Sequence, residues 1–289
     1  MNKKVTKHTI KNVFERTWKF ISKFPVAVRP KIRGIIFSNK GAQGREALFD
    51  VSYSGTGDIM AYWKDEHQGI IDISATEPGY EIKMPKDMGG FFSDNLCLVD
   101  NLEFLDVSHA NVSKTACFYR CFCGFGSKKK QDIYGLETWD VSNGDYFDLM
   151  FGGCFQYSRK NIDLDLSNWK FNKTGPCNIS LMGMFSEFAQ NTENVTLDLT
   201  GWDLEKAYRM QNMFFKFGEK SNCIDLKGVE MWNVPKEKCH YNCMFEKFAL
   251  KSAACLNLQE WSRNVPLQGP HEDFAKETFF QIQEPKWAN

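Results

Sequence analysis

Hydrophobic and polar residues alternate in a short segment that returns several times along this 289-residue chain. Leu164-Asp165-Leu166-Ser167-Asn168-Trp169 recurs as Leu197-Asp198-Leu199-Thr200-Gly201-Trp202. An alternation of period two places the leucines on one face of a strand and the polar residues on the other. Such segments bury their apolar faces by stacking on one another, so the pattern predicts a repeat protein.

The tryptophan that ends each copy is the first of two landmarks that define the repeat. Successive positions lie 29, 30, 33, 30 and 29 residues apart. They are filled by Ala110, Trp139, Trp169, Trp202, Trp232 and Trp261. A spacing this regular indicates stacked units of one type, each packed against its neighbours.

A Met-Phe pair between the tryptophans is the second landmark. We assign its Phe position to Tyr119, Phe151, Phe185, Phe214 and Phe245, with a further apolar residue three positions later. Apolar residues at these offsets are typical of a helix, so we expect a short helix or turn opposite each strand. The two landmarks together predict an α/β repeat solenoid in which parallel strands stack coil on coil.

Two strings in the repeat carry a resemblance to a known family: Leu-Asp-Leu-Ser-Asn-Trp at 164–169 and Met-Phe-Gly-Gly-Cys at 150–154. They resemble the BspA-like leucine-rich-repeat family, which occurs in bacterial surface proteins and mycoplasma lipoproteins. The resemblance covers about residues 103–262. It implies a leucine-rich-repeat-like fold and a role in binding proteins or surfaces, and it carries over no catalytic residue.

Charge is divided unevenly along the chain, although the formal net charge is +0. Residues 1–46 contain 12 basic and 2 acidic residues, which gives this arm a charge of +10 and the remainder −10. We therefore expect four parts: a basic arm at 1–46, a region leading into the repeats at 47–102, the repeats at 103–262, and a C-terminal cap or tail at 263–289. An acidic body attached to a basic arm limits the partners that each part would attract.

The basic arm shows the pattern of an amphipathic helix from about Thr6 to Phe24. Its apolar positions are Ile10, Val13, Phe14, Trp18 and Ile21, which share one helical face, and Pro25 ends it. One interpretation makes this helix the cap that closes the end of the repeats. Others place it against nucleic acid or on a membrane surface. The lysines that would then neutralise phosphates are Lys7, Lys11, Lys19 and Lys23.

The polar positions that alternate with the leucines form the predicted partner-binding face. If the strands line one continuous surface, these residues lie side by side: Asp165, Ser167, Asp198, Thr200, Asp225 and Lys227, joined by Asp140 and Asp203 just past the Trp position. Adjacent carboxylates on neighbouring strands repel one another, and a basic partner relieves that repulsion. The sequence thus favours a protein partner with a basic surface.

Three functions are compatible with this pattern. The first is a non-catalytic scaffold that binds another protein along the acidic face of the repeats. The second is a phage or mobile-element inhibitor that blocks the basic nucleic-acid channel of a bacterial defence nuclease, as anti-CRISPR proteins do. The third is a surface adhesin. Genomic neighbours and the location of the protein in the cell would separate the three.

Carboxylate and cysteine clusters have simpler explanations than catalysis or metal binding. Asp163 and Asp165 look like a catalytic pair, but Asp165 is the polar position of the repeat itself. Most of the 10 cysteines fall in repeat register as small buried side chains,. Cys239, His240 and Cys243 lack the paired Cys-x2-Cys spacing of a zinc ribbon,. We expect no enzyme, no metal and no other cofactor.

No run of residues approaches the roughly 18 apolar positions that a transmembrane helix needs. The first residues, Met1-Asn2-Lys3-Lys4, lead into no apolar segment with a small-residue cleavage site,. The sequence therefore predicts a cytoplasmic protein without a membrane span.

Overall fold

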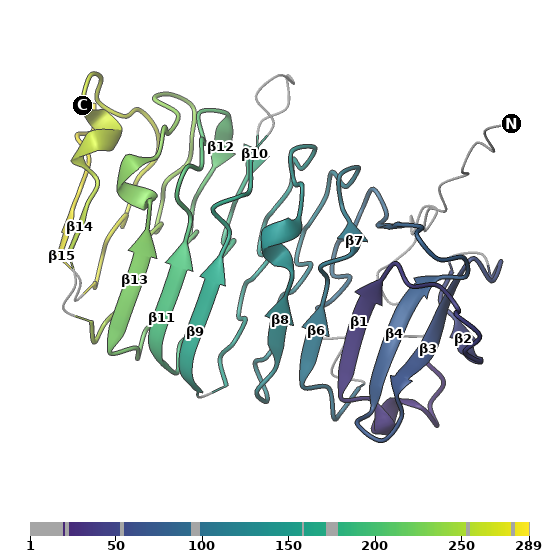
Figure 1. The fold of residues 1–289 in the computed structure, drawn as a ribbon. Coiled ribbons are helices and arrows are strands. Elements are labelled where there is room, and N and C mark those ends of the chain that lie inside the picture. The colour runs from purple at the N-terminus through teal and green to yellow at the C-terminus, as the bar shows by residue number, and fades with distance from the viewer. Residues whose placement is uncertain are drawn as a thin grey trace, which may run out of the picture.

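The structure, a computed structural model, describes most of the chain. It covers residues 20, 23–52, 55–93, 99–157, 159–171, 179–252, 255–278 and 281–288. The elements in these ranges are β-strands and short 3-10 helices, and the longer strands run side by side across the molecule (Figure 1).

The strands come from both the N-terminal region and the repeats. Those of the N-terminal region are β1 (Gly34–Ser38), β2 (Ala47–Asp50), β3 (Ile59–Asp65), β4 (Ile70–Ala75) and β5 (Ile82–Lys83). The others are β6 (Phe104–Asp106), β7 (Ala110–Asn111), β8 (Asp132–Tyr134), β9 (Arg159–Asp165), β10 (Ile179–Ser180), β11 (Thr192–Asp198), β12 (Ala207–Arg209), β13 (Cys223–Lys227), β14 (Cys255–Asn257) and β15 (Gln281–Gln283). The 3-10 helices are η1 (Arg29–Lys31), η3 (Leu136–Thr138), η4 (Val229–Met231) and η5 (Gln259–Ser262).

A six-stranded sheet in the order β2-β3-β4-β1-β6-β8 joins the N-terminal region to the first repeats. The pairs β2–β3 and β3–β4 are antiparallel, whereas β1 pairs in parallel with both β4 and β6. The inward side chains of β1 and β4 are fully buried: Ile35, Phe37, Ile71 and Ile73. Burial of these β-branched and aromatic side chains stabilises the sheet.

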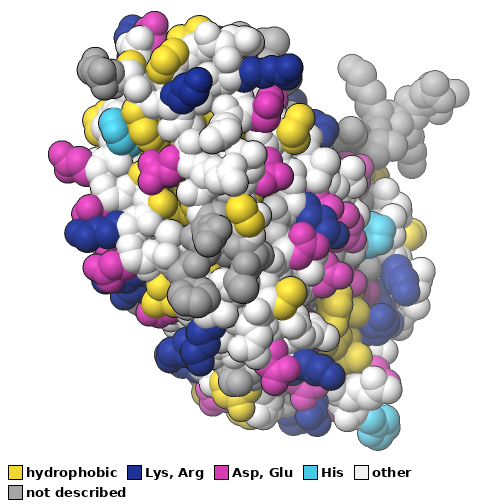
Figure 2. All heavy atoms as spheres, turned by 90° about the vertical axis from the view of Figure 1, so that its left-hand side faces the viewer, with side chains coloured by type: hydrophobic (Ala, Val, Ile, Leu, Met, Phe, Trp, Pro, Cys, Tyr) yellow, Lys and Arg dark blue, Asp and Glu magenta, His cyan; other side chains and the backbone are white. Residues whose placement is uncertain are grey.

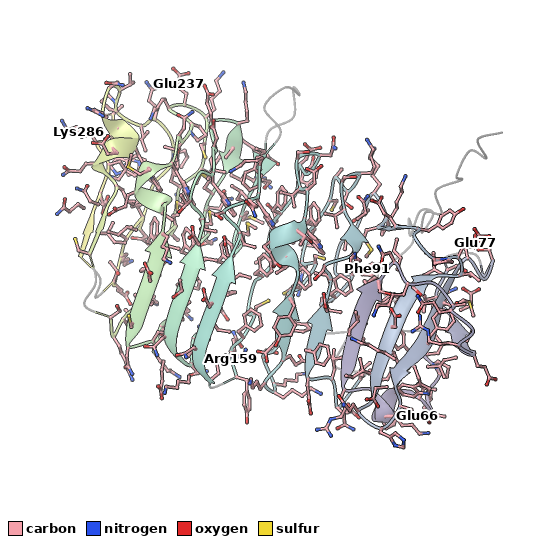
Figure 3. The ribbon with its side chains drawn as sticks, viewed as in Figure 1. Glu66, Glu77, Phe91, Arg159, Glu237 and Lys286 are labelled. Atoms are coloured by element: carbon pink, nitrogen blue, oxygen red, sulfur yellow. The ribbon has the colours of Figure 1, made fainter. Side chains whose placement is uncertain are left out.

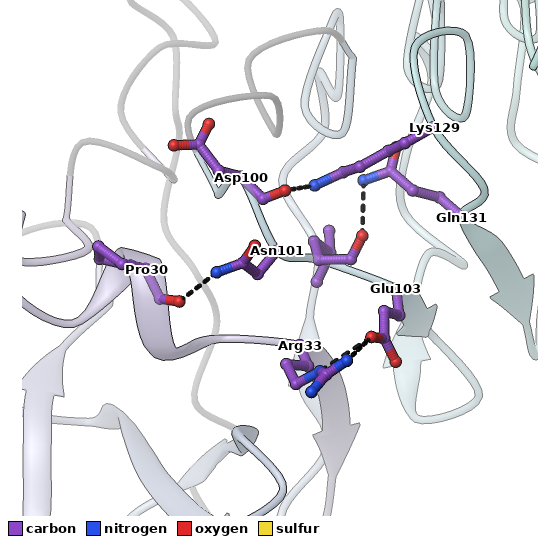
Figure 4. Close-up of polar contacts among 8 residues, drawn as sticks. Pro30, Arg33, Asp100, Asn101, Glu103, Lys129 and Gln131 are labelled. Carbon is purple, nitrogen blue, oxygen red and sulfur yellow. Dashed lines mark hydrogen bonds and ion pairs between the residues drawn. The ribbon is translucent and has the colours of Figure 1, made fainter.

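Polar contacts beside β1 reinforce this junction (Figure 4). The Asn101 side-chain amide donates a hydrogen bond of 2.6 Å to the carbonyl oxygen of Pro30. Arg33 forms an ion pair with Glu103, one residue before β6. Residues about 70 positions apart in the sequence are thereby fixed next to one another where β1 and β6 begin.

A three-stranded parallel sheet, β13-β11-β9, is formed by the strand segments of three consecutive repeats. Leu164 lies opposite Leu197, and Leu197 lies opposite Leu226. The expected parallel pairing of Leu-x-Leu segments is confirmed here. Their leucines face the core because the alternation of side chains has the same phase in each strand.

The predicted fold class, an α/β leucine-rich-repeat-like solenoid, is wrong. The described strands fall into five separate sheets, one of six strands, one of three and three of two. The side opposite the long strands contains short strands and isolated parallel bridges, such as Cys117 with Tyr146 and Arg209 with His240. Within the described ranges no α-helix lies between the strands of the repeats, so the repeats are built from strands, 3-10 helices and turns.

The Met-Phe segment is a run of turns because its backbone N–H groups alternate between two kinds of partner. Met213 donates to the carbonyl oxygen of Met210 within its own turn, whereas Phe214 donates to Met244 of the next repeat. Asn212 and Lys216 have φ values of 57° and 53°, in the left-handed region. An α-helix uses right-handed residues throughout and keeps its N–H groups for its own carbonyls. Bonding to the next repeat therefore replaces the expected helix.

The predicted N-terminal amphipathic helix lies largely outside the described residues, as do Lys7, Lys11 and Lys19. Phe20 and Phe24 are described and are buried against the end of the six-stranded sheet. The ring of Phe20 stacks on that of Phe91 with centroids 4.8 Å apart. These two side chains, near the end of the predicted helix, are thus part of the apolar core.

The tryptophans form a continuous stack through the repeats, as expected from their spacing. The ring centroids of Trp139, Trp169, Trp202, Trp232 and Trp261 lie 5.8–6.5 Å apart in succession. Each indole N–H donates to a backbone carbonyl of the preceding repeat; that of Trp202, for example, donates to Leu166 at 2.9 Å. Every tryptophan of this stack therefore buries its ring and satisfies its single donor.

Phenylalanines form a second stack beside the tryptophans, and this stack shows that the Phe position of the first repeat was assigned wrongly. Its members are Phe92, Phe122, Phe151, Phe185, Phe214 and Phe245. Phe122, not Tyr119, occupies the Phe position of the first repeat, and Tyr119 is 43% exposed. Cys121 replaces methionine in this copy, which displaced the assignment by three residues.

A search of the described residues for a long apolar helix that could cross a membrane finds none.

Candidate functional site

The aspartates that recur at the strand ends shape the turns that follow them. The Oδ1 atom of Asp165 accepts the backbone N–H of Ser167 at 2.9 Å, and that of Asp198 accepts the N–H of Thr200 at 3.0 Å. This is the Asx turn, in which a side chain satisfies the backbone two residues later. One oxygen of each carboxylate thus has a structural role.

The same turn recurs at the two predicted site residues beyond the tryptophans. Asp140 accepts the N–H of Ser142 at 3.1 Å, and Asp203 accepts that of Glu205 at 3.2 Å. Asp140 is exposed, whereas Asp203 is half-buried and also accepts a hydrogen bond from the Asn233 amide. The repeat therefore fixes the direction of these carboxylates before any partner arrives.

Glycine makes the turn where the repeat has no aspartate, and this explains the position of Lys227. Gly228 follows Lys227 with φ +81° and precedes η4. A Cβ atom on Gly228 would lie 2.4 Å from the Cα atom of Thr200, so only glycine fits,. Because the turn no longer needs a carboxylate, lysine is tolerated in the same row as Asp165 and Asp198.

The register places the predicted face in two rows and corrects its order. Asp165, Asp198 and Lys227 lie opposite one another in one row. Asp225 belongs to a second row with Asp163 and Thr196, two residues earlier along each strand. Ser167 and Thr200 lie in the turns beyond the strands. The eight predicted residues are therefore spread over strands and turns and do not form a single ladder.

Hydrogen bonds favour the ionised form of Asp165. The pKa of Asp165 lies below its ordinary value, chiefly because the Ser167 hydroxyl donates to it, then because the Ser167 backbone N–H does so, with Lys227 adding attraction. A lowered pKa means that the ionised form is favoured in the folded protein. The stability that this brings is present above the ordinary aspartate range and is lost as the pH falls through the lowered pKa.

The outward positions of the strands are acidic on balance. Carboxylates occur at Asp106, Asp132, Asp163, Asp165, Asp198 and Asp225. Lys227 is the basic residue in the two rows, and it lies 3.7 Å from Asp225. Arg159, at the start of β9 (Figure 3), has a side chain only 5% exposed and pairs with Asp132 at 3.0 Å. A basic partner would therefore meet mostly negative charge on this face.

The end of the molecule near β14 and β15 has a different character. Figure 2 shows acidic and basic side chains interspersed on this end, without a region of one sign. Charge alone therefore gives a partner less reason to choose this end than to choose the strand face.

A pocket of about 260 Å³ lies beside the first Trp position, which is filled by Ala110. It includes the predicted site residue Asp140. The residues that line it are Glu81, Ser108, His109, Ala110, Asn111, Val112, Ser113, Thr138 and Asp140. Sequence reasoning missed Glu81, His109 and Thr138; the sequence signal was the loss of tryptophan at position 110.

The arm residue Lys23 contacts the body of the protein. Its Nζ atom donates to the backbone carbonyl of Ser52 at 2.7 Å. Of the four lysines predicted as possible nucleic-acid contacts, Lys23 is the one within the described ranges. The contact is what an end-covering segment would make.

The cysteines near His240 do not converge on it. Cys239 is buried and His240 is exposed, and burial raises the pKa of the Cys239 thiol to about 12. Instead, ligand atoms of Cys243, Glu246 and Asp273 lie within 4.8 Å of one another. Burial is the main cause that raises the pKa of Cys243 to about 11, which disfavours the thiolate that a metal requires.

We predict that the protein contains well below one zinc ion per chain when purified without added metal, as measured by elemental analysis. Lysines already compensate the carboxylates of the Cys243 cluster. Lys276 lies 3.2 Å from Asp273, and Lys247 lies 3.8 Å from Glu246. Near-stoichiometric zinc that disappears in Cys243→Ser would contradict this prediction.

Comparison with known proteins places most of the repeat region in one family. A family model described as "Mycoplasma protein of unknown function, DUF285" matches residues 86–227 and, in a second alignment, residues 118–261. Two overlapping matches displaced by about one repeat are what a periodic sequence produces. Neither a search of the curated proteins nor a search of the solved structures found a match.

Proposed function

This chain belongs to the family of Mycoplasma proteins of unknown function DUF285, and we propose that it is a non-catalytic repeat protein that binds another protein through the acidic strand face. The observation that carries the proposal is the set of carboxylates held in fixed directions by Asx turns in several repeats. Preorganised groups bind more tightly because less entropy is lost on association.

The extent of the face supports a macromolecular partner. Asp165, Asp198 and Asp225 lie on the neighbouring strands β9, β11 and β13, and Asp140 lies in a turn of the repeat before them; Asp203 follows Asp198 in the same repeat. Each strand adds about 4.8 Å, so four repeats present charge over roughly 15 Å. A surface of this length suits a protein with several basic side chains better than a small molecule.

The lowered pKa of Asp165 favours a role in binding over a role in catalysis. A general acid or base works best with a pKa near neutrality. The pKa of Asp165 is instead lowered by the hydrogen bonds from Ser167. A carboxylate whose ionised form is favoured is suited to electrostatic attraction, which raises association rates and selects basic partners.

The test replaces Asp165, Asp198 and Asp203 together with asparagine. Asparagine keeps an Oδ1 acceptor for the turn, as Asn111 and Asn257 already do in this chain, each at 3.0 Å. The thermal midpoint should stay nearly unchanged, while affinity for the natural partner should fall roughly 10- to 100-fold, at about 0.5–1 kcal/mol per charge removed. Partner capture from the source cells, compared between wild type and variant by quantitative mass spectrometry, identifies the ligand. Its affinity is then measured with purified partner.

A matched control neutralises three carboxylates outside the rows. Glu46, Glu66 and Glu272 are exposed, and their replacement by glutamine changes the net charge by the same amount. This variant should retain the partner at wild-type affinity. Undiminished binding by the asparagine variant would mean that the carboxylate rows are only a solvated face.

A further inference from the structure

We propose that the pocket beside Ala110 accepts the guanidinium group of an arginine side chain. The inference deepens the proposed function and rests on it, since the arginine would belong to the bound protein. Arginine is among the residues that most often dominate binding energy at protein interfaces, because one planar group can satisfy several acceptors at once.

The register of the short strands places carboxylates on both sides of β7. In the parallel pair β5–β7, Ile82 lies opposite Ala110, and Glu81 immediately precedes β5. Asp140 belongs to the following repeat, one residue past Trp139. With strands about 4.8 Å apart and a stagger of two residues along them, the two acidic residues flank β7 at a backbone separation of roughly 12 Å. Side chains that extend into this gap from both sides leave room for a guanidinium between them.

Each carboxylate is oriented by one oxygen. The side-chain amide of Asn111 donates to Oε2 of Glu81 at 2.7 Å, and the backbone N–H of Ser142 donates to Oδ1 of Asp140 at 3.1 Å. Within the described part of the chain, the remaining oxygen of each carboxylate has no hydrogen bond. Two carboxylate oxygens are thus left as acceptors for a cationic donor.

The pocket is the right size and polarity for one side chain. Its volume of about 260 Å³ is below the roughly 300–1,000 Å³ of pockets for drug-sized ligands. Ala110 and Val112 in its lining are buried, and Ser108, Ser113 and Thr138 are the lining residues that carry hydroxyl groups. A guanidinium has five N–H donors and no acceptor, which complements a lining rich in acceptors.

In a following repeat, a lysine of the chain itself occupies the position after the tryptophan. At the position that follows the tryptophan, successive repeats carry Asn111, Asp140, Lys170 and Asp203. Lys170 therefore lies between two aspartates. The Lys170 ammonium donates to the carbonyl oxygen of Ser167 at 3.0 Å. Lys83 lies opposite Asn111 beside the pocket, but no lysine or arginine is among the residues that line it, so a cation inside the pocket would come from a partner.

The experiment uses the full chain and a small probe, N-acetyl-arginine methylamide. The ring signals of His109 are followed by NMR and assigned by their loss in His109→Gln. These signals should shift saturably with the arginine probe, at least tenfold more weakly with the lysine analogue, and not at all with the uncharged citrulline analogue. Glu81→Gln with Asp140→Asn removes both negative charges and keeps the hydrogen bonds that shape the pocket. The double variant should therefore bind arginine at least tenfold more weakly.

Equal responses to arginine and citrulline, or unchanged binding by the double variant, would overturn the pocket assignment. So would the absence of a saturable response in the wild type. The asparagine variant of Asp165, Asp198 and Asp203 leaves the pocket residues unchanged. It should bind the probe normally, so a failed pocket and a failed strand-face interaction are distinguished.

Discussion

Replacing Phe214 with alanine is expected to lower the free energy of unfolding by about 3–5 kcal/mol. Phe214 is fully buried in the middle of the phenylalanine stack. Its ring lies 5.7 Å from that of Phe185 and 5.2 Å from that of Phe245. The rigid turns on either side cannot close the space, because their backbones are hydrogen-bonded to neighbouring repeats. A cavity therefore adds to the lost transfer free energy.

The neighbouring residue provides a control of the same type. Phe215 is half-buried beside Phe214, and Phe215→Ala should cost under about 1.5 kcal/mol because little volume inside the core is lost,. Urea unfolding followed by tryptophan fluorescence measures both values. Equal midpoints for the two variants would contradict the assignment of the phenylalanine stack as the centre of the core.

The parallel strands and the tryptophan stack could be predicted because local sequence determines them. The alternation around Leu164 and Leu197 has the period of a strand, and a tryptophan follows at a constant distance,. The Met-Phe segment was less informative. Phe214 and Phe217 are spaced as in a helix, but they occur in successive turns whose i to i−3 bonds bring the same residues to one side. Sequence does not show whether an N–H group bonds within its segment or to the next repeat.

The candidate site was predictable in its residue types but not in its geometry. The repeat pointed to Asp165 and Asp198, and register places them opposite one another. Asp225 was assigned to the wrong row because Lys227, which replaces the aspartate at the strand end, breaks the motif by which copies are aligned. Glu81 reaches the pocket only through the pairing of β5 with β7, a contact between distant segments that no local pattern shows.

Replacing Arg45 with methionine is expected to destabilise the N-terminal sheet by about 3–5 kcal/mol. Its guanidinium pairs at 2.7 Å with Asp72, whose side chain is only 2% exposed. The guanidinium also lies 4.7 Å from the ring centroid of Tyr62 and donates to the carbonyl oxygen of Gly41. Methionine preserves much of the packing but leaves the Asp72 charge buried without compensation, which costs more than the pair itself contributes.

An exposed ion pair in the same region separates this effect from loss of charge in general. The side chains of Arg33 and Glu103 are 59% and 54% exposed, so Arg33→Met should change stability by under about 1 kcal/mol,. Combining Arg45→Met with Asp72→Leu should restore most of the lost stability, since both buried charges are then removed. Urea midpoints of the three variants test this order. If Arg45→Met is no worse than Arg33→Met, the carboxylate of Asp72 finds water in the folded protein, and the buried pair does not stabilise this end of the core.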